Sequence, residues 1–166
     1  MVLYALITAA IIAADQIVKY WAKSSLMEIG TIPLIRDVFH LTYAENKGAA
    51  FSILEGQRWF FILLTSVMLV VIALAFFKEY FKGKWGKTTL VFIFAGAIGN
   101  FIDRLLLGYV VDMFDFRLID FPVFNVADIF LTIGGFMGVI YILFMDKDLF
   151  KDEKKVEENN DTENNG

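Results

Sequence analysis

Four long apolar runs alternate with shorter polar stretches along the chain. Trp59–Phe77, Ile129–Met145 and Thr88–Ile102 contain 19, 17 and 15 successive uncharged residues, and Met1–Ala14 forms the fourth run. A helix needs about 20 mainly apolar residues to cross the hydrocarbon core of a bilayer. The pattern therefore predicts four membrane-spanning helices, at about residues 2–22, 58–77, 88–107 and 126–145.

The first run has a second interpretation, as a cleaved secretory signal peptide. It has no basic residues before the apolar stretch and no small-residue cleavage site after it. Asp15 and Lys19 also stand where such a stretch would finish. We therefore interpret the first run as a retained membrane helix.

Two segments between the predicted helices, at about residues 23–57 and 108–125, carry a different pattern. Phe39, Leu41 and Tyr43 alternate with polar neighbours, and Phe114, Phe116 and Leu118 do the same. A period of two is typical of a half-buried strand. We predict an all-α integral membrane protein with four transmembrane helices, whose outward loops form a small extracytoplasmic β-sheet at the outer membrane interface.

The lysines predict the orientation of the helices. The connection from Lys78 to Lys87 holds four lysines and one glutamate, and four more lysines follow Met145. Basic residues in short loops mark the cytoplasmic side. We therefore expect both termini in the cytoplasm and the segments 23–57 and 108–125 on the outside.

Composition and charge narrow the class of protein. Apolar residues make up 58% of the 166 residues, above the roughly 45–50% of soluble domains. From Asp146 onward, eight acidic residues and four lysines carry the whole formal charge of −4, so we predict one domain at 1–146 and an acidic, disordered tail at 147–166. No basic face remains for nucleic acid. The chain has no Cys and one His (His40), which argues against thiolate or His-rich metal sites, and we expect no metal and no cofactor.

Charged residues within membrane helices are costly, by about 2.5–3.5 kcal/mol at the bilayer centre, and are candidates for function. Asp15 and Lys19 are four residues apart and can pair on one helix face, either as a neutralised anchor at the outer interface or as support for a polar site. Arg104 can bind a carboxylate or phosphate, or anchor to lipid headgroups. We expect its neighbour Asp103 to be solvated.

Asp112 closes the third predicted helix and Asp128 opens the fourth, both on the outward side. Two adjacent carboxylates share one proton, so that the ionised acid can activate water while the neutral one protonates the substrate. Spacing alone leaves other interpretations open. Asn125 and Asp128 have the spacing of a helix cap followed by an acidic first-turn residue, and Asp112 fits an ordinary interfacial aspartate.

Other functions fit parts of this pattern. In a small transporter or proton-relay subunit the same carboxylates would bind a cation or pass protons, although both lie at one interface and form no path through the bilayer. The spacings Gly134–Gly138 and Ala95–Gly99 predict close helix packing, which would also suit a non-enzymatic assembly factor. A Ser-Lys peptidase would pair a serine with a nearby lysine. The candidates are Ser24, Ser25 or Ser52 for the serine and Lys19, Lys23 or Lys47 for the lysine.

Five segments resemble motifs of the lipoprotein signal peptidases (signal peptidase II), in that family's order. They are residues 15–19 (DQIVK), 46–51 (NKGAAF), 96–104 (GAIGNFIDR), 110–112 (VVD) and 121–128 (FPVFNVAD). Each motif is modest alone, but five in order over about residues 15–128 are specific.

The resemblance implies an aspartic endopeptidase of the bacterial cell membrane, with Asp112 and Asp128 as its catalytic dyad. It implies that the remaining motif residues line, brace or support the site: Asn46, Gly48, Asn100, Arg104, Asn125, Asp15 and Lys19. The implied substrate is a prolipoprotein whose lipobox cysteine already carries diacylglycerol and which is cleaved just before that cysteine. Membrane lipids and globomycin-like cyclic peptide inhibitors are the other implied partners.

Overall fold

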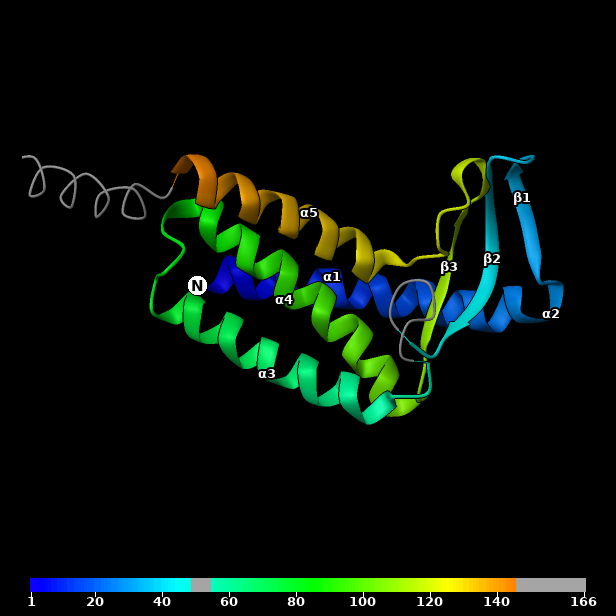
Figure 1. Cartoon of the computed structure of the whole chain (residues 1–166), viewed down its shortest axis with the longest axis horizontal. Helices are drawn as coiled ribbons and strands as arrows, with labels where there is room; N and C mark the ends of the chain where they lie inside the picture. Colours follow the sequence, from blue (N-terminus) through cyan, green and yellow to red (C-terminus); the bar gives the residue numbers. More distant parts are fainter. Residues whose placement is uncertain (49–54, 146–166) are drawn as a thin grey trace, which may run out of the picture.

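Four long helices form an elongated bundle with a small sheet at one end (Figure 1). The computed structural model describes residues 1–48 and 55–145. The long helices are α1 (Val2–Trp21), α3 (Arg58–Phe77), α4 (Gly83–Leu106) and α5 (Val126–Ile140), the last of which continues through a π-helical turn at Tyr141–Met145. Each of the four is long and apolar enough to cross a membrane, which confirms the predicted fold class.

The helices bury very different shares of their surface. α4 is the central helix and packs against α1, α3 and α5. α3 buries only Phe61 and Ile72 and exposes most of its other apolar side chains, as expected of a helix that faces lipid. On the first helix, the buried positions are spaced by three or four residues and so form one inward stripe, made of Ile11, Asp15, Lys19, Ala22 and Leu26. The two charged residues of this helix therefore face the protein interior.

Two helix boundaries differ from the prediction. The first helix does not end near residue 22, because a π-helical turn (Ala22–Leu26) carries it into α2 (Met27–Ile29). Gly30 then ends it with a φ of 81°, and the Gly30 N–H bonds to the Leu26 carbonyl oxygen at 2.7 Å. α4 begins at Gly83 rather than near residue 88, so Lys84 and Lys87 belong to its first turns.

The sheet has three antiparallel strands in the order β1 (Thr31–Ile35), β2 (Phe39–Asn46) and β3 (Val110–Phe116). The alternation at Phe39–Tyr43 identified β2. The alternation from Phe114 identified only the end of β3, and the prediction was wrong at Leu118, which lies in a 3-10 turn. β1 was missed because Pro33 weakens its strand pattern; Pro33 is tolerated here because β1 is an edge strand.

A small apolar core fixes the sheet to the end of the first helix. Ala22 and Leu26 from the helix pack against Val111 and Met113 from β3, and all four side chains are buried. Because residues alternate along a strand, burial of Val111 and Met113 on one face turns Asp112 between them toward the other. The packing of the sheet on the first helix thus sets the direction of the Asp112 side chain.

Candidate active site

Asp112 lies on β3 and not at the end of a helix, which corrects the prediction that it closes the third span. It pairs with Ala44 of β2. Between the pairs Leu41–Phe114 and Ala44–Asp112, two residues of β2 stand opposite one residue of β3, which is a β-bulge. Asn46, two residues beyond Ala44, shares the face of Asp112, and its Nδ2 donates to Asp112 Oδ2 at 3.1 Å. Asp112 is only 2% exposed, so it is not an ordinary interfacial aspartate.

Asp128 lies in the first turn of α5, where a capping box begins the helix. The Asp128 N–H donates to Asn125 Oδ1 at 3.0 Å, and the Asn125 N–H donates to Asp128 Oδ2 at 3.1 Å. The capping interpretation of these two residues is therefore confirmed. The second oxygen of the carboxylate, Oδ1, accepts from Asn100 Nδ2 at 2.7 Å.

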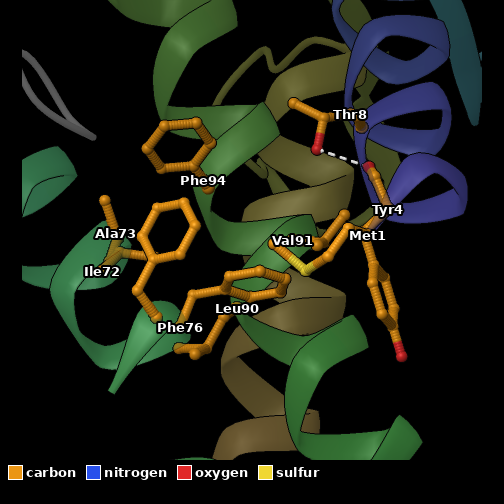
Figure 2. A pocket seen from close by; sticks show the side chains of 11 residues that line it. Met1, Tyr4, Thr8, Ile72, Ala73, Phe76, Leu90, Val91 and Phe94 are labelled. Atoms are coloured by element: carbon orange, nitrogen blue, oxygen red, sulfur yellow. Dashed lines mark hydrogen bonds between the residues drawn. The ribbon is translucent and has the colours of Figure 1, made fainter. Parts of the chain in front are cut away.

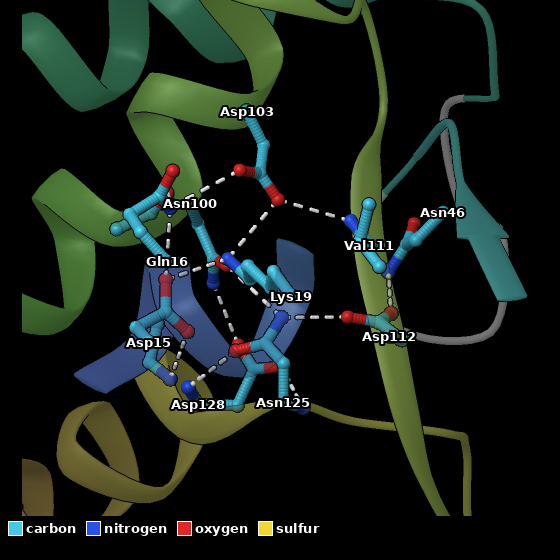
Figure 3. Close-up of polar contacts among 12 residues, drawn as sticks. Asp15, Gln16, Lys19, Asn46, Asn100, Asp103, Val111, Asp112, Asn125 and Asp128 are labelled. Carbon is cyan, nitrogen blue, oxygen red and sulfur yellow. Dashed lines mark hydrogen bonds and ion pairs between the residues drawn. The ribbon is translucent and has the colours of Figure 1, made fainter. Parts of the chain in front are cut away.

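Asn125 joins the two carboxylates. Its Nδ2 donates to Asp112 Oδ1 at 2.6 Å and also to Asn100 Oδ1 at 3.0 Å, while its main chain bonds to Asp128 (Figure 3). Asn125 is fully buried. The strand β3 and the start of the next long helix, α5, thus present two carboxylates to one amide side chain.

A buried charged cluster supports Asn100 from the first helix. Lys19 Nζ lies 2.9 Å from Asp15 Oδ2 and donates to Asn100 Oδ1 at 2.8 Å. The other oxygen of Asp15 accepts from the Ala127 N–H at 2.8 Å, in the first turn of α5. Asp15 and Lys19 do form the predicted pair, but they are buried in the bundle, so the interpretation as an anchor at the interface was wrong.

Asp103 belongs to the same cluster, and the expectation that it is solvated was wrong. Its side chain is 3% exposed; Oδ2 lies 3.1 Å from Lys19 Nζ and accepts from the Val111 N–H at 3.0 Å. Gln16 Nε2 donates to Asp103 Oδ1 at 3.2 Å. The spacing of three residues between Asn100 and Asp103 would have placed both on one helix face, and that signal was available in the sequence.

Arg104 lies on a different face of α4 from Asp103. Its Nη2 donates to the Gly48 carbonyl oxygen at 3.0 Å, and its guanidinium lies 4.9 Å from the centre of the Phe61 ring. Arg58, a residue not singled out from the sequence, donates to the carbonyl oxygens of Arg104 and Leu105 at 2.8 and 2.7 Å. These contacts hold the C-terminal end of α4, where Arg104 lies, against the start of α3.

A cavity of about 800 Å³ opens onto both carboxylates. Its polar lining comes from Asn46, Asn100, Arg104, Asp112 and Asp128, together with Glu45 and Asp120. Its apolar lining includes Phe121 and Phe124 from the loop before α5, and Ile129 and Ile133 along α5. The volume lies in the range of about 300–1,000 Å³ that is typical of ligand sites. Of the nine predicted residues, five line the cavity, while Gly48, Asp15, Lys19 and Asn125 lie behind it.

The environment of Asp112 favours its neutral form. Burial raises the pKa of the Asp112 carboxyl to about 7, and the negative charge of Asp128 acts in the same direction. Hydrogen bonds from Asn46 and Asn125 and the positive charge of Lys19 oppose the rise. A carboxyl with a pKa near 7 can both hold and release a proton at physiological pH.

The alternative sites find no support in the contacts of the described residues. The Ser24 hydroxyl donates to the Trp21 carbonyl oxygen, while Lys19 contacts the acidic cluster and Lys23 lies over the Tyr109 ring. Ser52, residues 49–51 of the second motif and the tail at 147–166 lie outside the described residues. Among residues 1–48 and 55–145, no group of His, Cys, Asp or Glu is arranged to hold a metal ion.

A second cavity, of about 240 Å³, lies toward the other end of the bundle between α1, α3 and α4 (Figure 2). Its lining is apolar apart from Tyr4 and Thr8, and the Thr8 hydroxyl is already bonded to the Tyr4 carbonyl oxygen at 2.9 Å. It offers no acid, base or nucleophile, so the chemistry belongs to the first cavity.

Comparison with known proteins finds relatives that match most of the chain. The lipoprotein signal peptidase of Clostridioides difficile (strain 630) is 43% identical over 144 residues, which cover 87% of this chain and 97% of the relative. The lipoprotein signal peptidase of Brevibacillus brevis is 48% identical over 153 residues, covering 92% and 97%. A bacterial membrane enzyme solved by the in meso method superposes with a TM-score of 0.81 at 36% identity, covering 91% of this chain and 93% of that one.

The family model of signal peptidase (SPase) II matches residues 7–144, which include most of α1 and all of α3, α4, α5 and the sheet. With the match spanning the helices and the sheet alike, the chain belongs to the signal peptidase II family.

Proposed function

We propose that Asp112 and Asp128 form the catalytic dyad of a membrane aspartic endopeptidase. Family membership makes the chain a peptidase that removes signal peptides from prolipoproteins. The observation that supports the dyad is the convergence of two carboxylates on Asn125 at the wall of one cavity. Among residues 1–48 and 55–145, each carboxylate oxygen accepts from one donor, so both groups are held in a fixed orientation.

The dyad performs hydrolysis with one shared proton. The ionised carboxylate takes a proton from a water molecule as the water oxygen attacks the scissile carbonyl carbon, and the neutral carboxyl donates its proton to the carbonyl oxygen. The tetrahedral intermediate then collapses: the carboxyl that took the proton from water gives it to the amine nitrogen as the C–N bond breaks. A hydroxyl of the intermediate returns its proton to the other carboxylate as the carbonyl reforms, which restores the dyad. Asp112, whose pKa is raised to about 7 mainly by burial, is the group suited to hold the proton at rest.

The shape of the cavity suits a substrate that is partly lipid. Its polar part surrounds the two aspartates, and its apolar part follows Ile129 and Ile133 along a helix that is long enough to span the bilayer. A prolipoprotein whose cysteine carries diacylglycerol can therefore diffuse in the bilayer and place its scissile bond at the dyad while its acyl chains stay in an apolar environment. We propose that cleavage falls just before the lipidated cysteine.

Two further properties follow from this assignment. The lysines at the start of α4 support a cytoplasmic location for that end of the bundle, with the sheet and the cavity on the extracytoplasmic side of a bacterial membrane. A globomycin-like cyclic peptide that enters the cavity would exclude the prolipoprotein and inhibit the enzyme.

Purified protein and a diacylglyceryl-modified prolipoprotein test the dyad, with signal-peptide release followed by gel shift. Asp112→Asn and Asp128→Asn should each abolish cleavage. Asp115→Asn is the matched control. Asp115 lies on β3 like Asp112 and is also buried, but its carboxylate accepts from Thr42 and Arg117 and does not line the cavity. Cleavage at the wild-type rate by either dyad variant would refute the assignment.

A further inference from the structure

Asp103 is a buried carboxylate that the catalytic steps above do not use, yet it contacts both parts of the site. It lies on α4, and its Oδ2 meets Lys19 of the first helix and the main chain of β3. Removing a carboxylate from water costs free energy, which the cluster offsets through the ammonium of Lys19 and N–H donors. Asp15 alone would neutralise the charge of Lys19, since the two side chains lie 2.9 Å apart. Charge neutralisation therefore does not explain why Asp103 is buried here as well.

The first path leads from Asp103 to Asp112. Asp103 Oδ2 accepts the Val111 N–H at 3.0 Å, and Val111 is the residue immediately before Asp112 on β3. On its other edge Val111 pairs with Glu45 of β2, and the bulge in that pairing lies just beyond Asp112, opposite Met113. The hydrogen bond to Asp103 therefore fixes the position of β3 relative to α4, and with it the position of the Asp112 carboxylate.

The second path leads from Asp103 through Lys19 and Asn100 to Asp128. An ammonium carries three N–H donors and no acceptor. Here its three acceptors are Asp15, Asp103 and Asn100 Oδ1, at 2.9, 3.1 and 2.8 Å from Nζ. Because every donor has a partner, Lys19 has one defined orientation.

The charge of Lys19 decides which way the Asn100 amide points. A cation can only donate, so the amide oxygen must face Lys19, and the NH2 group is then left to face Asp128, which can only accept when ionised. Asn100 Nδ2 donates to Asp128 Oδ1 at 2.7 Å. Asn125 Nδ2 also reaches Asn100 Oδ1, at 3.0 Å, but it lies closer to Asp112, at 2.6 Å.

We infer that Asp103 and Lys19 are positioning residues that align the two proposed catalytic carboxylates, Asp103 through β3 and Lys19 through Asn100. The inference rests on the proposed dyad. Neither residue lines the cavity, so neither is expected to contact the substrate. Their effect should therefore fall on the chemical step and leave substrate binding almost unchanged.

Steady-state kinetics with the diacylglyceryl prolipoprotein test this directly. Asp103→Asn keeps an acceptor for the Val111 N–H but removes the negative charge facing Lys19, and Lys19→Met removes the donor to Asn100. Each should lower kcat by about 10- to 100-fold, the effect of a misplaced reacting group, with KM within about twofold of wild type. Because Asp103 and Lys19 contact each other at 3.1 Å, the double variant should lose less than the product of the two single losses.

The dependence of kcat on pH distinguishes a positioning role from a purely stabilising one, because an ion pair that only stabilises the fold would not change it. The charged groups that face the dyad are Asp15 and Lys19 on the first helix, Asp103 and Arg104 on α4, Glu45 on β2, and Asp120 in the loop before α5. The positive charge of Lys19 lowers the pKa of Asp112 against the effect of burial. Lys19→Met should therefore shift the alkaline limb of kcat to higher pH, while Asp115→Asn should leave it in place.

The outcomes separate this inference from the proposed function. If Asp112→Asn and Asp128→Asn are inactive while Asp103→Asn and Lys19→Met keep the wild-type kcat and pH profile, the dyad stands and the positioning role is wrong. A rise in KM at unchanged kcat would also overturn it, because that would place these residues in substrate binding. If Lys19→Met does not fold, Asp103→Asn alone and the double variant, which buries one charge fewer, still decide the question through kcat.

Discussion

At the scale of single residues, Asn125 shows how the capping of α5 is compatible with the catalytic role proposed for Asp128. Its side-chain oxygen caps α5 and its side-chain nitrogen donates to Asp112, so the two roles use different atoms of one amide. The cap also fixes the amide orientation, because the Asp128 N–H requires an oxygen as its partner. A helix start thereby holds one proposed catalytic acid and directs a donor at the other.

Two substitutions of Asn125 should separate these roles. Asn125→Ser keeps a good capping oxygen but removes the donor to Asp112, so stability should change little while cleavage falls by at least about tenfold. Asn125→Ala removes both and should in addition cost about 1 kcal/mol of stability. Thermal unfolding in detergent and the gel-shift assay measure the two effects. Equal loss of stability in both variants would show that the serine does not cap α5.

The wild-type enzyme should lose activity as the pH rises through about 7. The pKa of Asp112 is raised to about 7, first by burial and then by the charge of Asp128, so Asp112 is neutral below that pH and ionised above it. The proposed dyad needs one proton, and its alkaline limb reports the loss of that proton from the pair. Rates of cleavage at saturating substrate, measured from about pH 5 to about pH 9, would reveal this limb. A rate that keeps rising to about pH 9 would contradict the assignment of the proton to Asp112.

The sequence identified most of the site residues but not how they contact one another. Charge inside apolar runs singled out Asp15, Lys19 and Arg104, and the ordered motifs added the asparagines. Asp103 was assigned to solvent because it neighbours Arg104, whereas adjacent residues on a helix point about 100° apart and here face different partners. The partners that decide its burial, Lys19 and the Val111 N–H, come from distant parts of the chain.

At the scale of elements, close approach of α4, α5 and the first helix depends on glycine. A Cβ atom at Gly99 would lie 2.5 Å from Asp15 Oδ2, and one at Gly96 would lie 2.5 Å from the Ala127 carbonyl oxygen. A Cβ at Gly134 would lie 2.7 Å from Ile93 Cγ1. The small-residue spacings therefore do mark helix packing, and at Gly99 the packing brings α4 onto the charged cluster.

Gly99→Ala should damage both stability and catalysis. Its methyl group would displace the Asp15 carboxylate, which holds Lys19 and the Ala127 N–H, and overpacking of this kind costs about 1–3 kcal/mol. Gly135→Ala is the matched control, since nothing lies within 4 Å of its Cβ and alanine favours a helix. The control should unfold at the same or a higher temperature with normal cleavage. A Gly99→Ala variant as stable and active as the control would show that the cluster tolerates the extra volume.

The elements also show where sequence patterns stop being informative. The four helices were predictable because apolar runs of that length have few other uses. β3 was not fully predicted, because Val110 and Val111 extend the apolar run of α4 and only the turn at Gly108, with a φ of 87°, separates them. Apolar residues before a turn are compatible with helix or strand, and pairing with β2 decides between them.

At the scale of the whole molecule, charge and chemistry are placed at opposite ends of the bundle. In Figure 1 the sheet lies at one end, and the N-terminus and the end of α5 lie at the other. No charged residue occurs between Lys87 and Asp103 of α4, between Asp128 and Met145, or within Trp59–Phe77 of α3. The described helices therefore offer no chain of charged groups across the bilayer, which favours a peptidase at one interface over a proton relay.

Single cysteines can test the orientation, because the chain contains none of its own. Leu118, 64% exposed in the turn after β3, marks the sheet end, and the exposed Lys84 in the first turn of α4 marks the other end. The lysine-rich connection between α3 and α4 should remain in the cytoplasm, so the sheet should face outward. A membrane-impermeant maleimide should label Leu118→Cys in intact cells and Lys84→Cys only after permeabilisation. The reverse pattern would place the cavity in the cytoplasm, away from any substrate exported across the membrane, and would exclude the proposed access of the prolipoprotein from the outer leaflet.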